Sequence, residues 1–375
     1  MSKLRVAFFI DAIRAGAGTE NQVLDLLRRL DPLRFETYLF TLREPVPESV
    51  ARSIPSRCEC LGLGRLLSLG ALKTFWKLVR TLRRERIDIA MLYFADSQLF
   101  VPPAAFLSRR TVCVVNRRDM GYWYTPGLLR ALRWVNKFVD YFLVNADAVK
   151  DMVARNEKFP RERIKVIHNS LAIKPSEALH RHDLGLPEDA PIVVLVANLR
   201  PIKRVDRFIH MAALVATERS DARFLILGSG DLHGDLIQRA ARLGIADRIT
   251  FAGSVENVGA YLRLCDVGVM TSESEGLSNT LIEYSYHCLP AVAFDTGGNA
   301  EVIADGVTGF LVPEGDLSSM ASRVLQLLNE PALRKELGES GRKRVEDIFS
   351  PAARLSDIEE FLVTVASKRG SATFH

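Results

Sequence analysis

Several features of membrane-spanning and metal-binding proteins are absent from this 375-residue sequence. No apolar run approaches the ~20 residues that a helix needs to cross a bilayer. The five cysteines are scattered and odd in number, and Cys58 and Cys60 have no second pair at zinc-finger spacing, so the sequence indicates reduced thiols. It contains neither an Asp-x-Asp sequence nor the Gly-Lys-Ser/Thr of a P-loop ATPase.

The N-terminal apolar stretch is short. VAFFI is followed closely by Asp11 and is too short for the centre of a signal peptide. Hydrophobic residues make up 48% of the chain and charged residues 25%, as in ordinary globular proteins. We therefore expect a cytoplasmic protein.

Positive charge is concentrated in the first half. Residues 1–180 contain 30 Lys and Arg against 18 Asp and Glu, a net charge of +12, whereas residues 181–375 contain 20 against 27, a net charge of −7. A basic half predicts a polyanionic partner, such as a membrane surface, a phosphorylated acceptor or nucleic acid. Solvated helix faces would account for the same charge without a partner.

Strand-like and helix-like patterns alternate along the chain. Runs such as LRVAFFI and IVVLV are apolar throughout, which is typical of strands buried in a parallel sheet, and amphipathic helical stretches separate them. The pattern predicts an α/β fold of two Rossmann-like, doubly wound parallel-sheet domains facing a central cleft. We expect an N-terminal acceptor-side domain over 1–168, a polar linker over 169–190, a C-terminal donor domain over 191–350, a helix over 351–366 that packs back toward the N-terminal domain, and a tail over 367–375.

Two glycine loops follow predicted strands. Gly16 and Gly18 come after LRVAFFI, and Gly228 and Gly230 come after RFLIL, but neither loop completes the dinucleotide-binding fingerprint. Each loop would present backbone N–H groups at a helix N-terminus, where anions bind. A strand-to-helix turn also needs glycine for conformational reasons alone.

A third turn carries two glutamates. VGVMT is a predicted strand and TLIEYSYH a predicted helix, so Glu275 lies in the turn and Glu283 lies one turn inside the helix. A carboxylate repels phosphate but accepts hydrogen bonds from sugar hydroxyls, whereas the first-turn N–H groups suit a phosphate. Glu283 would also interact favourably with the helix dipole merely by lying near the N-terminus.

The Glu275-x7-Glu283 spacing, within EGLSNTLIEYSYHCLPAVAFDTGGNAEVI, resembles the donor-site motif of the family-four glycosyltransferases, which are retaining enzymes of the GT-B fold. VANLRPIKRVDRFI is similar to that family's loop with a phosphate-binding lysine, here Lys203, and the segment from FLILGSG to ITFAG is similar to the one around the nucleotide base. In the first half, GAGTENQVL resembles the N-terminal glycine loop, and VIHNS resembles the entry to the linker. The resemblance is specific over 190–315.

The resemblance implies metal-independent transfer of a hexose-type sugar from a UDP- or GDP-linked donor to a saccharide or lipid-linked acceptor, in cell-surface glycan biosynthesis and without a cofactor. Glu283 would hold the ribose, and Lys203 would neutralise the diphosphate where charge develops as the glycosidic bond breaks. Besides Lys203, the expected catalytic residues are Glu275, Arg200 and Asp119. The other expected donor-binding residues are Gly16, Gly18, Asn198, Gly228, Gly230, Ser254, Val255, Gly276, Leu277, Ser278, Asn279 and Thr280.

Two departures from the family concern these sites. Asn198 stands where many relatives have a phosphate-binding arginine, although Arg200 is close by. At the end of the strand TVCVVN, many relatives carry a histidine where this chain has Asn116, followed by Arg117 and Arg118. We expect these three residues to bind the acceptor, with one arginine on an acceptor phosphate, because guanidinium groups bind phosphate in a bidentate way.

Basic and aromatic residues are mixed in two segments, 73–88 and 117–138. Such segments suit a surface near anionic lipids, so we expect peripheral association with the inner membrane and no nucleic-acid partner. For segment 73–88, a core-facing helix with a solvated basic side is the alternative. An inactive GT-B scaffold and a nucleotide-sugar epimerase also stay open, as does a nucleic-acid-binding protein, which would leave the donor motif unexplained.

Overall fold

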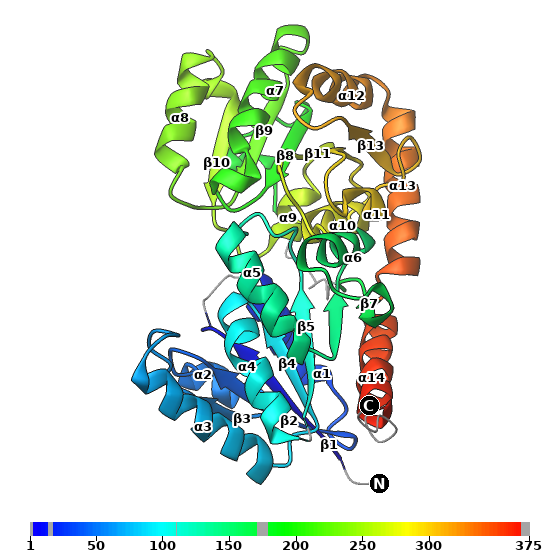
Figure 1. Cartoon of the computed structure of the whole chain (residues 1–375). Coiled ribbons are helices and arrows are strands. Elements are labelled where there is room, and N and C mark those ends of the chain that lie inside the picture. The colour runs from blue at the N-terminus through cyan, green and yellow to red at the C-terminus, as the bar shows by residue number, and fades with distance from the viewer. Residues whose placement is uncertain (1–2, 14–17, 110, 171–178, 369–375) are drawn as a thin grey trace. The chain divides into compact units, whose positions relative to one another are not determined.

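The computed structural model describes residues 3–13, 18–109, 111–170 and 179–368 (Figure 1). The chain divides into two compact units: unit 1 comprises residues 1–168 and 352–375, and unit 2 comprises residues 169–351. Within the described ranges, no helix combines the length and the apolar character that crossing a membrane requires.

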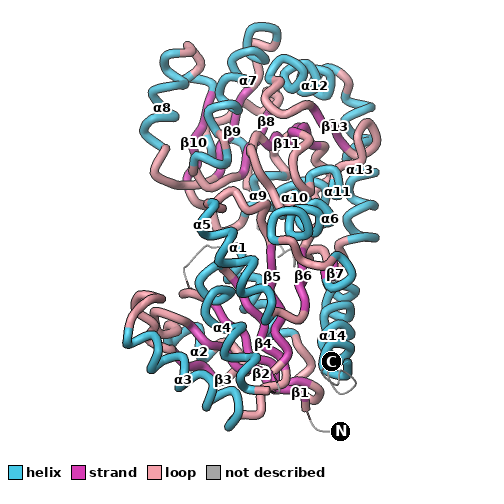
Figure 2. Tube along the Cα trace, viewed as in Figure 1, coloured by secondary structure: helices cyan, strands magenta, loops and turns pink. Residues whose placement is uncertain are grey.

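Unit 1 is built on a parallel sheet of seven strands in the order β3-β2-β1-β4-β5-β6-β7 (Figure 2). The strands are β1 (Leu4–Ile10), β2 (Phe35–Thr41), β3 (Arg57–Cys60), β4 (Ile89–Tyr93), β5 (Val112–Arg117), β6 (Tyr141–Val144) and β7 (Ile164–Val166). The helices are α1 (Gly18–Arg29), α2 (Glu48–Arg52), α3 (Leu69–Arg84), α4 (Ala95–Ser108), α5 (Pro126–Val135), α6 (Asp147–Met152) and α14 (Pro351–Lys368).

The C-terminal helix α14 completes the core of unit 1. Phe361 and Leu362 of α14 are buried in one apolar cluster with Val23 of α1 and with Phe8 of β1. The strands β1 and β4 are almost completely buried, which is why their sequences are apolar throughout. The edge strand β3 is half exposed and polar, and its sequence carries no strand pattern.

Unit 2 is built on a parallel sheet of six strands in the order β10-β9-β8-β11-β12-β13. The strands are β8 (Ile192–Val196), β9 (Arg223–Leu227), β10 (Ile249–Gly253), β11 (Val267–Met270), β12 (Ala291–Phe294) and β13 (Gly309–Val312). The helices are α7 (Val205–Glu218), α8 (His233–Arg242), α9 (Val258–Leu262), α10 (Asn279–Tyr286), α11 (Asn299–Val302), α12 (Leu317–Asn329) and α13 (Pro331–Ile348). The predicted α/β fold with two Rossmann-like parallel sheets is confirmed.

In each sheet the strand order reverses beside the first strand of the unit. β1 lies between β2 and β4, and β8 lies between β9 and β11. Open parallel sheets bind ligands outside the carboxyl ends of the strands at such a switch point, because the flanking connections run to opposite faces of the sheet. Ligand-binding sites are therefore expected at the loops after β1 and β4 in unit 1 and at those after β8 and β11 in unit 2.

Candidate functional site

At the switch point of unit 2, the loops after β8 and β11 join through an ion pair. Lys203 Nζ lies 2.6 Å from Glu275 Oε1, and the two side chains are 27% and 11% exposed. The backbones are tied as well: Glu273 N–H donates to the Ile202 carbonyl (3.0 Å), and Thr271 Oγ1 donates to the Lys203 carbonyl (3.1 Å). These hydrogen bonds hold the lysine and the glutamate in fixed positions on the two loops.

Helix α10 begins at the same loop. Ser278 is its N-cap, and Ser278 Oγ accepts a hydrogen bond from the Leu281 N–H (3.2 Å). Within the described part of the chain, no group accepts a hydrogen bond from the backbone N–H groups of residues 276–280. Such N–H groups at a helix N-terminus bind anions. Leu277 is only 5% exposed and packs into the protein.

Glu283 lies one turn inside α10 and lacks a partner of the kind that Glu275 has. Burial raises the pKa of the Glu283 carboxyl group to about 7. No described residue donates a hydrogen bond to this carboxyl group or forms an ion pair with it. Glu283 is half-buried, and a partly desolvated carboxylate without a partner is energetically costly, so its presence in a loop–helix junction marks a candidate ligand-binding group.

The glycines after β9 have a packing explanation. Gly228 has a φ of 141°, and a Cβ atom there would lie 1.9 Å from the Ala197 carbonyl oxygen. A Cβ atom at Gly230 would lie 2.6 Å from the Leu199 carbonyl oxygen. Glycine is required at both positions because the loops after β8 and β9 pack backbone against backbone.

The remaining predicted donor residues of unit 2 lie at the same edge of its sheet. Asn198 and Arg200 follow β8 and are both exposed. Ser254 and Val255 follow β10, where Ser254 is exposed and Val255 half-buried. Because parallel neighbouring strands end at one edge, these loops and the Lys203–Glu275 pair share that edge of unit 2.

Unit 1 has a cavity of about 400 Å³ at its own switch point. The lining comes from the ends of β1, β4 and β5, the starts of α1 and α4, and the loop after β5: Asp11, Thr19, Tyr93, Phe94, Ala95, Asn116, Arg117, Arg118, Asp119, Tyr122 and Trp123. Gly18 begins α1 beside Thr19, whereas Gly16 lies outside the described residues. The three residues predicted to bind the acceptor therefore do share a cavity, together with Asp119.

Asn116 brings an unsatisfied amide to this cavity. Its side chain is 4% exposed, and both Oδ1 and Nδ2 are buried without a hydrogen-bond partner among the residues described. An amide offers two donors and an acceptor, and each buried group left unmatched costs about 1–3 kcal/mol. A ligand with hydroxyl groups would supply the missing partners.

Arg117 forms a buried ion pair that the sequence did not indicate. Its Nη2 lies 2.9 Å from Glu157 Oε1, and the two side chains are 2% and 0% exposed. Glu157 Oε2 accepts hydrogen bonds from Gln98 and Asn136, each at 2.9 Å, and Oε1 accepts one from the Tyr124 hydroxyl. Although burial raises it, the Arg117 charge and these hydrogen bonds hold the pKa of Glu157 below its usual value.

This network also shapes the loop after β5. The Arg117 guanidinium lies 4.9 Å from the Trp123 ring centre and 5.8 Å from that of Tyr124. Asp119 accepts hydrogen bonds from the Gly121 N–H (2.7 Å) and the Trp123 indole N–H (2.8 Å). Arg117 and Asp119 thus both hold the cavity wall, and the Arg117 charge is largely neutralised by Glu157.

Two further ionisable groups face the cavity. Arg118 contacts Gln22 Oε1 and the Tyr93 hydroxyl, and burial lowers the pKa of its guanidinium. Burial, reinforced by the nearby charge of Asp96, raises the pKa of Asp11 to about 7. Asp11 was not among the predicted site residues, although an acidic residue directly after the first strand was the available signal.

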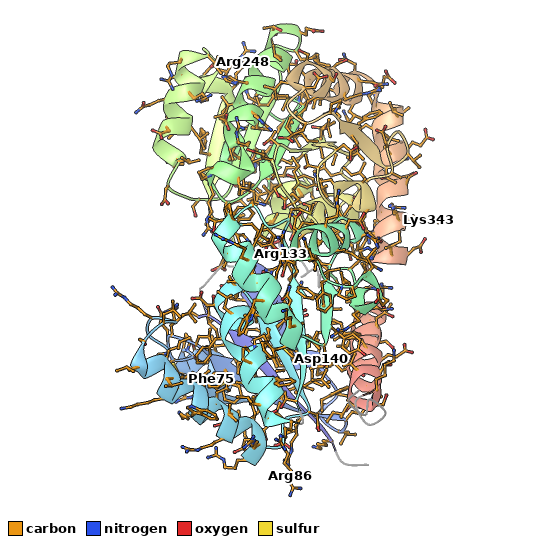
Figure 3. The ribbon with its side chains drawn as sticks, viewed as in Figure 1. Phe75, Arg86, Arg133, Asp140, Arg248 and Lys343 are labelled. Atoms are coloured by element: carbon orange, nitrogen blue, oxygen red, sulfur yellow. The ribbon has the colours of Figure 1, made fainter. Side chains whose placement is uncertain are left out.

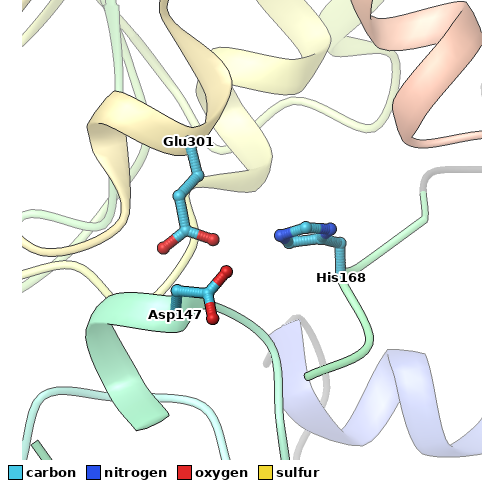
Figure 4. A group of neighbouring side chains, drawn as sticks. All are labelled: Asp147, His168 and Glu301. Carbon is cyan, nitrogen blue, oxygen red and sulfur yellow. The ribbon is translucent and has the colours of Figure 1, made fainter. Parts of the chain in front are cut away.

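Figure 4 draws three side chains that could ligate a metal: Asp147 at the start of α6, His168 after β7, and Glu301 in α11. The first two belong to unit 1 and Glu301 belongs to unit 2. Because the group is divided between the units, we build no metal site from it.

Comparison with known families agrees with this geometry. Residues 176–344 match the family described as glycosyl transferases group 1, and residues 16–173 match the one described as glycosyltransferase family 4. The chain belongs to the family-four glycosyltransferases. The family membership predicted from Glu275, Glu283 and Lys203 is thereby confirmed.

Curated relatives and solved structures extend the comparison. The chain is 29% identical over 204 residues to N-acetyl-alpha-D-glucosaminyl L-malate synthase of Bacillus anthracis, which is 53% of each chain. It is 29% identical over 209 residues to the lipopolysaccharide core biosynthesis glycosyltransferase LpsE of Rhizobium meliloti, or 56% of this chain and 59% of that one. The chain thus spans about half the length of the curated relatives it matches.

A solved structure, Alr3699/HepE of Anabaena in complex with UDP, matches with a TM-score of 0.82 and 21% identity. The match covers 96% of this chain and 100% of the other. This likeness confirms the GT-B fold.

Proposed function

We propose that the chain is a retaining glycosyltransferase that moves a hexose-type sugar from a nucleoside-diphosphate sugar to a saccharide or lipid-linked acceptor. One observation carries the proposal. At the switch point of unit 2, the loop before α10 and the loop after β8 bring together a lysine–glutamate pair with N–H groups and a carboxyl group that have no hydrogen-bond partner among the described residues. This combination of groups matches a donor that has a diphosphate at its centre and hydroxyl groups at both ends.

The diphosphate is assigned to Lys203 and to the N–H groups of residues 276–280. As the bond between the sugar and the diphosphate breaks, negative charge grows on the leaving oxygen, and fixed positive groups stabilise it there. Glu275 holds the Lys203 ammonium in place through their 2.6 Å contact, and its second oxygen is available for the hydroxyls of the sugar. Arg200, exposed in the same loop as Lys203, supplies a second cation for the phosphates.

The ribose is assigned to Glu283. Two hydroxyl groups donating to its carboxylate would supply the partners that the described residues do not provide, and charge-assisted hydrogen bonds of this kind contribute about 1.5–3 kcal/mol each. The remaining predicted donor residues at this edge, Asn198, Ser254 and Val255, border the base or the phosphates. UDP is the first nucleotide to test, with GDP as the alternative.

The acceptor is assigned to the cavity of unit 1. Its unsatisfied Asn116 amide and the Asp11 carboxyl group suit the hydroxyl groups of a saccharide, and Arg118 suits a phosphate of a lipid-linked acceptor. Arg117 and Asp119 keep a positioning role in the cavity wall. Transfer needs no divalent metal and no cofactor in this proposal, because Lys203 and the N–H groups supply the positive charge at the diphosphate.

The cellular setting completes the proposal. A saccharide or lipid-linked acceptor fits a role in assembling cell-surface glycans, and the relative LpsE is named for lipopolysaccharide core biosynthesis. Nucleotide sugars are cytoplasmic metabolites, so the reaction is placed in the cytoplasm, at its membrane when the acceptor is lipid-linked.

Calorimetric titration with UDP and GDP tests the donor assignment. Glu283→Gln and Lys203→Ala should each weaken binding of the preferred nucleotide by at least about tenfold, because each removes a charge-assisted contact. Lys335→Ala and Glu339→Gln on α13 are matched controls, since both side chains are well exposed there. Their affinities should equal that of the unmodified protein.

Two outcomes would contradict parts of the proposal. Unchanged nucleotide affinity in both site variants would remove the donor assignment. Nucleotide binding without transfer or hydrolysis of any nucleotide sugar tested would favour the inactive scaffold instead.

A further inference from the structure

Helix α3 of unit 1 is apolar on two faces. The inner face packs into the unit through Ala71, Leu78 and Leu82, as the outer helices of α/β folds do. On the outer face, and in the loop just before the helix, apolar side chains also face the solvent. We call this row the α3 stripe: Leu67, Leu69, Leu72 and Trp76, which are 98%, 84%, 55% and 48% exposed. Figure 3 labels Phe75 on this helix and Arg86 just beyond its end.

Local helix structure does not explain the stripe. Ser68 is the N-cap, and its Oγ accepts a hydrogen bond from the Ala71 N–H (3.1 Å). A hydrophobic staple would pack the residue before the cap, Leu67, against Leu72 in the first turn. Leu67 is almost fully exposed, so no staple forms, and Leu72 also stays more than half exposed.

The chain segment that carries the stripe has charges of one sign. Residues 65–84 contain six Lys and Arg and no Asp or Glu. Lys73 and Arg80 lie on the exposed side of α3 and form no ion pair with any residue described, whereas Lys77 pairs with Glu59 at 2.7 Å. A row of apolar side chains bordered by lysine and arginine matches the interface of an anionic bilayer, where apolar groups enter the acyl boundary and cations meet the headgroups.

Other occupants fit this surface less well. Two copies of the chain meeting through the α3 stripe would bring Lys73 and Arg80 against the same cations of the partner. Nucleic acid would neutralise those cations but leave Leu69 and Trp76 in water. A bilayer satisfies both groups at once.

We infer that the α3 stripe and the cations beside it bind the surface of a membrane that contains anionic phospholipids. The loop that leads into α3 is also linked to a residue next to the acceptor cavity. Arg43 donates to the Gly64 carbonyl (2.7 Å), in the loop that leads into α3, and pairs with Asp96, which follows the cavity residue Ala95. Delivery of a lipid-linked acceptor to that cavity rests on the proposed function, whereas the membrane contact itself does not.

Vesicle flotation tests the inference without donor or acceptor present. The whole chain should float with vesicles of phosphatidylcholine mixed with phosphatidylglycerol, and only weakly with phosphatidylcholine alone. Combining Leu69→Ser, Leu72→Ser and Trp76→Ser should reduce the bound fraction at least about tenfold, because the apolar part of the contact is lost. Combining Lys73→Glu with Arg80→Glu should reduce it strongly at low salt.

Leu33→Ser is the matched control, because Leu33 is 80% exposed on unit 1 but lies outside the α3 stripe. It should float like the unmodified protein. Circular dichroism and UDP affinity check that every variant is folded. The inference is overturned if the unmodified chain does not bind anionic vesicles, or if the variant with Leu69→Ser, Leu72→Ser and Trp76→Ser floats unchanged. It is also overturned if these substitutions change only self-association or oligonucleotide binding. None of these outcomes bears on nucleotide binding by unit 2, so failure here and failure of the proposed function can be told apart.

Discussion

Glu283→Gln should stabilise unit 2 and at the same time weaken nucleotide binding. Burial raises the pKa of Glu283 from its usual value of 4.5 to about 7. The carboxyl group therefore holds a proton more tightly in the folded chain than in the unfolded chain. Stability from this group is fully present below about pH 4.5, declines as the pH rises toward 7, and is lost above that.

The magnitude follows from the size of the shift. A rise from 4.5 to about 7 corresponds to a penalty of at most roughly 3 kcal/mol for the ionised form above neutrality. Glutamine has nearly the same shape and no charge, so the variant avoids this penalty. For a unit of this size, the melting temperature at about pH 8 should rise by up to roughly 10 °C, and at about pH 4 it should hardly change.

Differential scanning calorimetry with and without UDP measures both effects. The transition that UDP raises identifies the unit that binds it. UDP affinity of the unmodified protein should fall about tenfold between pH 8 and 6, because about a tenth of the carboxyl groups stays ionised one unit below the pKa. Glu275→Gln is the control variant within the same motif. It breaks the ion pair with Lys203 and therefore should not stabilise unit 2. A Glu283→Gln protein that is no more stable at high pH, or that binds UDP normally, would refute the reasoning.

Three further predictions concern the cavity of unit 1 and the chemistry. Glu157→Gln leaves the buried Arg117 charge without its counter-ion, so it should destabilise unit 1 by about 3–5 kcal/mol in denaturant unfolding and raise the acceptor KM while UDP affinity stays the same. Asn116→Ala should raise the acceptor KM without lowering the melting temperature, since its amide has no hydrogen-bond partner among the described residues; a drop in stability with normal kinetics would argue against a ligand-binding role. Excess EDTA should leave initial rates within about twofold, because fixed cations and N–H groups replace a metal, and NMR of the first product should show the anomer of the donor.

Patterns of local origin were predictable from the sequence. The runs LRVAFFI, IDIAMLY and VGVMT became buried strands because strands covered on both faces must be apolar throughout. The turn with Glu275 and the helix with Glu283 were also predictable from local sequence, because a strand, a capping serine and a helical pattern follow one another within a few residues. The edge strand β3 was not predictable from the sequence, because half of its residues face the solvent and need no apolar side chain.

Contacts between side chains that are distant in the chain became known only from the tertiary structure. Arg117 and Glu157 are 40 residues apart, and neither carries a local signal of the buried ion pair that they form in the wall of the cavity. From the sequence alone, segment 73–88 was open to two interpretations, a core-facing helix with a solvated basic side or a membrane-facing helix. Only the packing of α3 shows that it is core-facing through Leu78 and also leaves Leu69 and Trp76 in solvent, because the direction of each side chain is fixed by what the helix packs against.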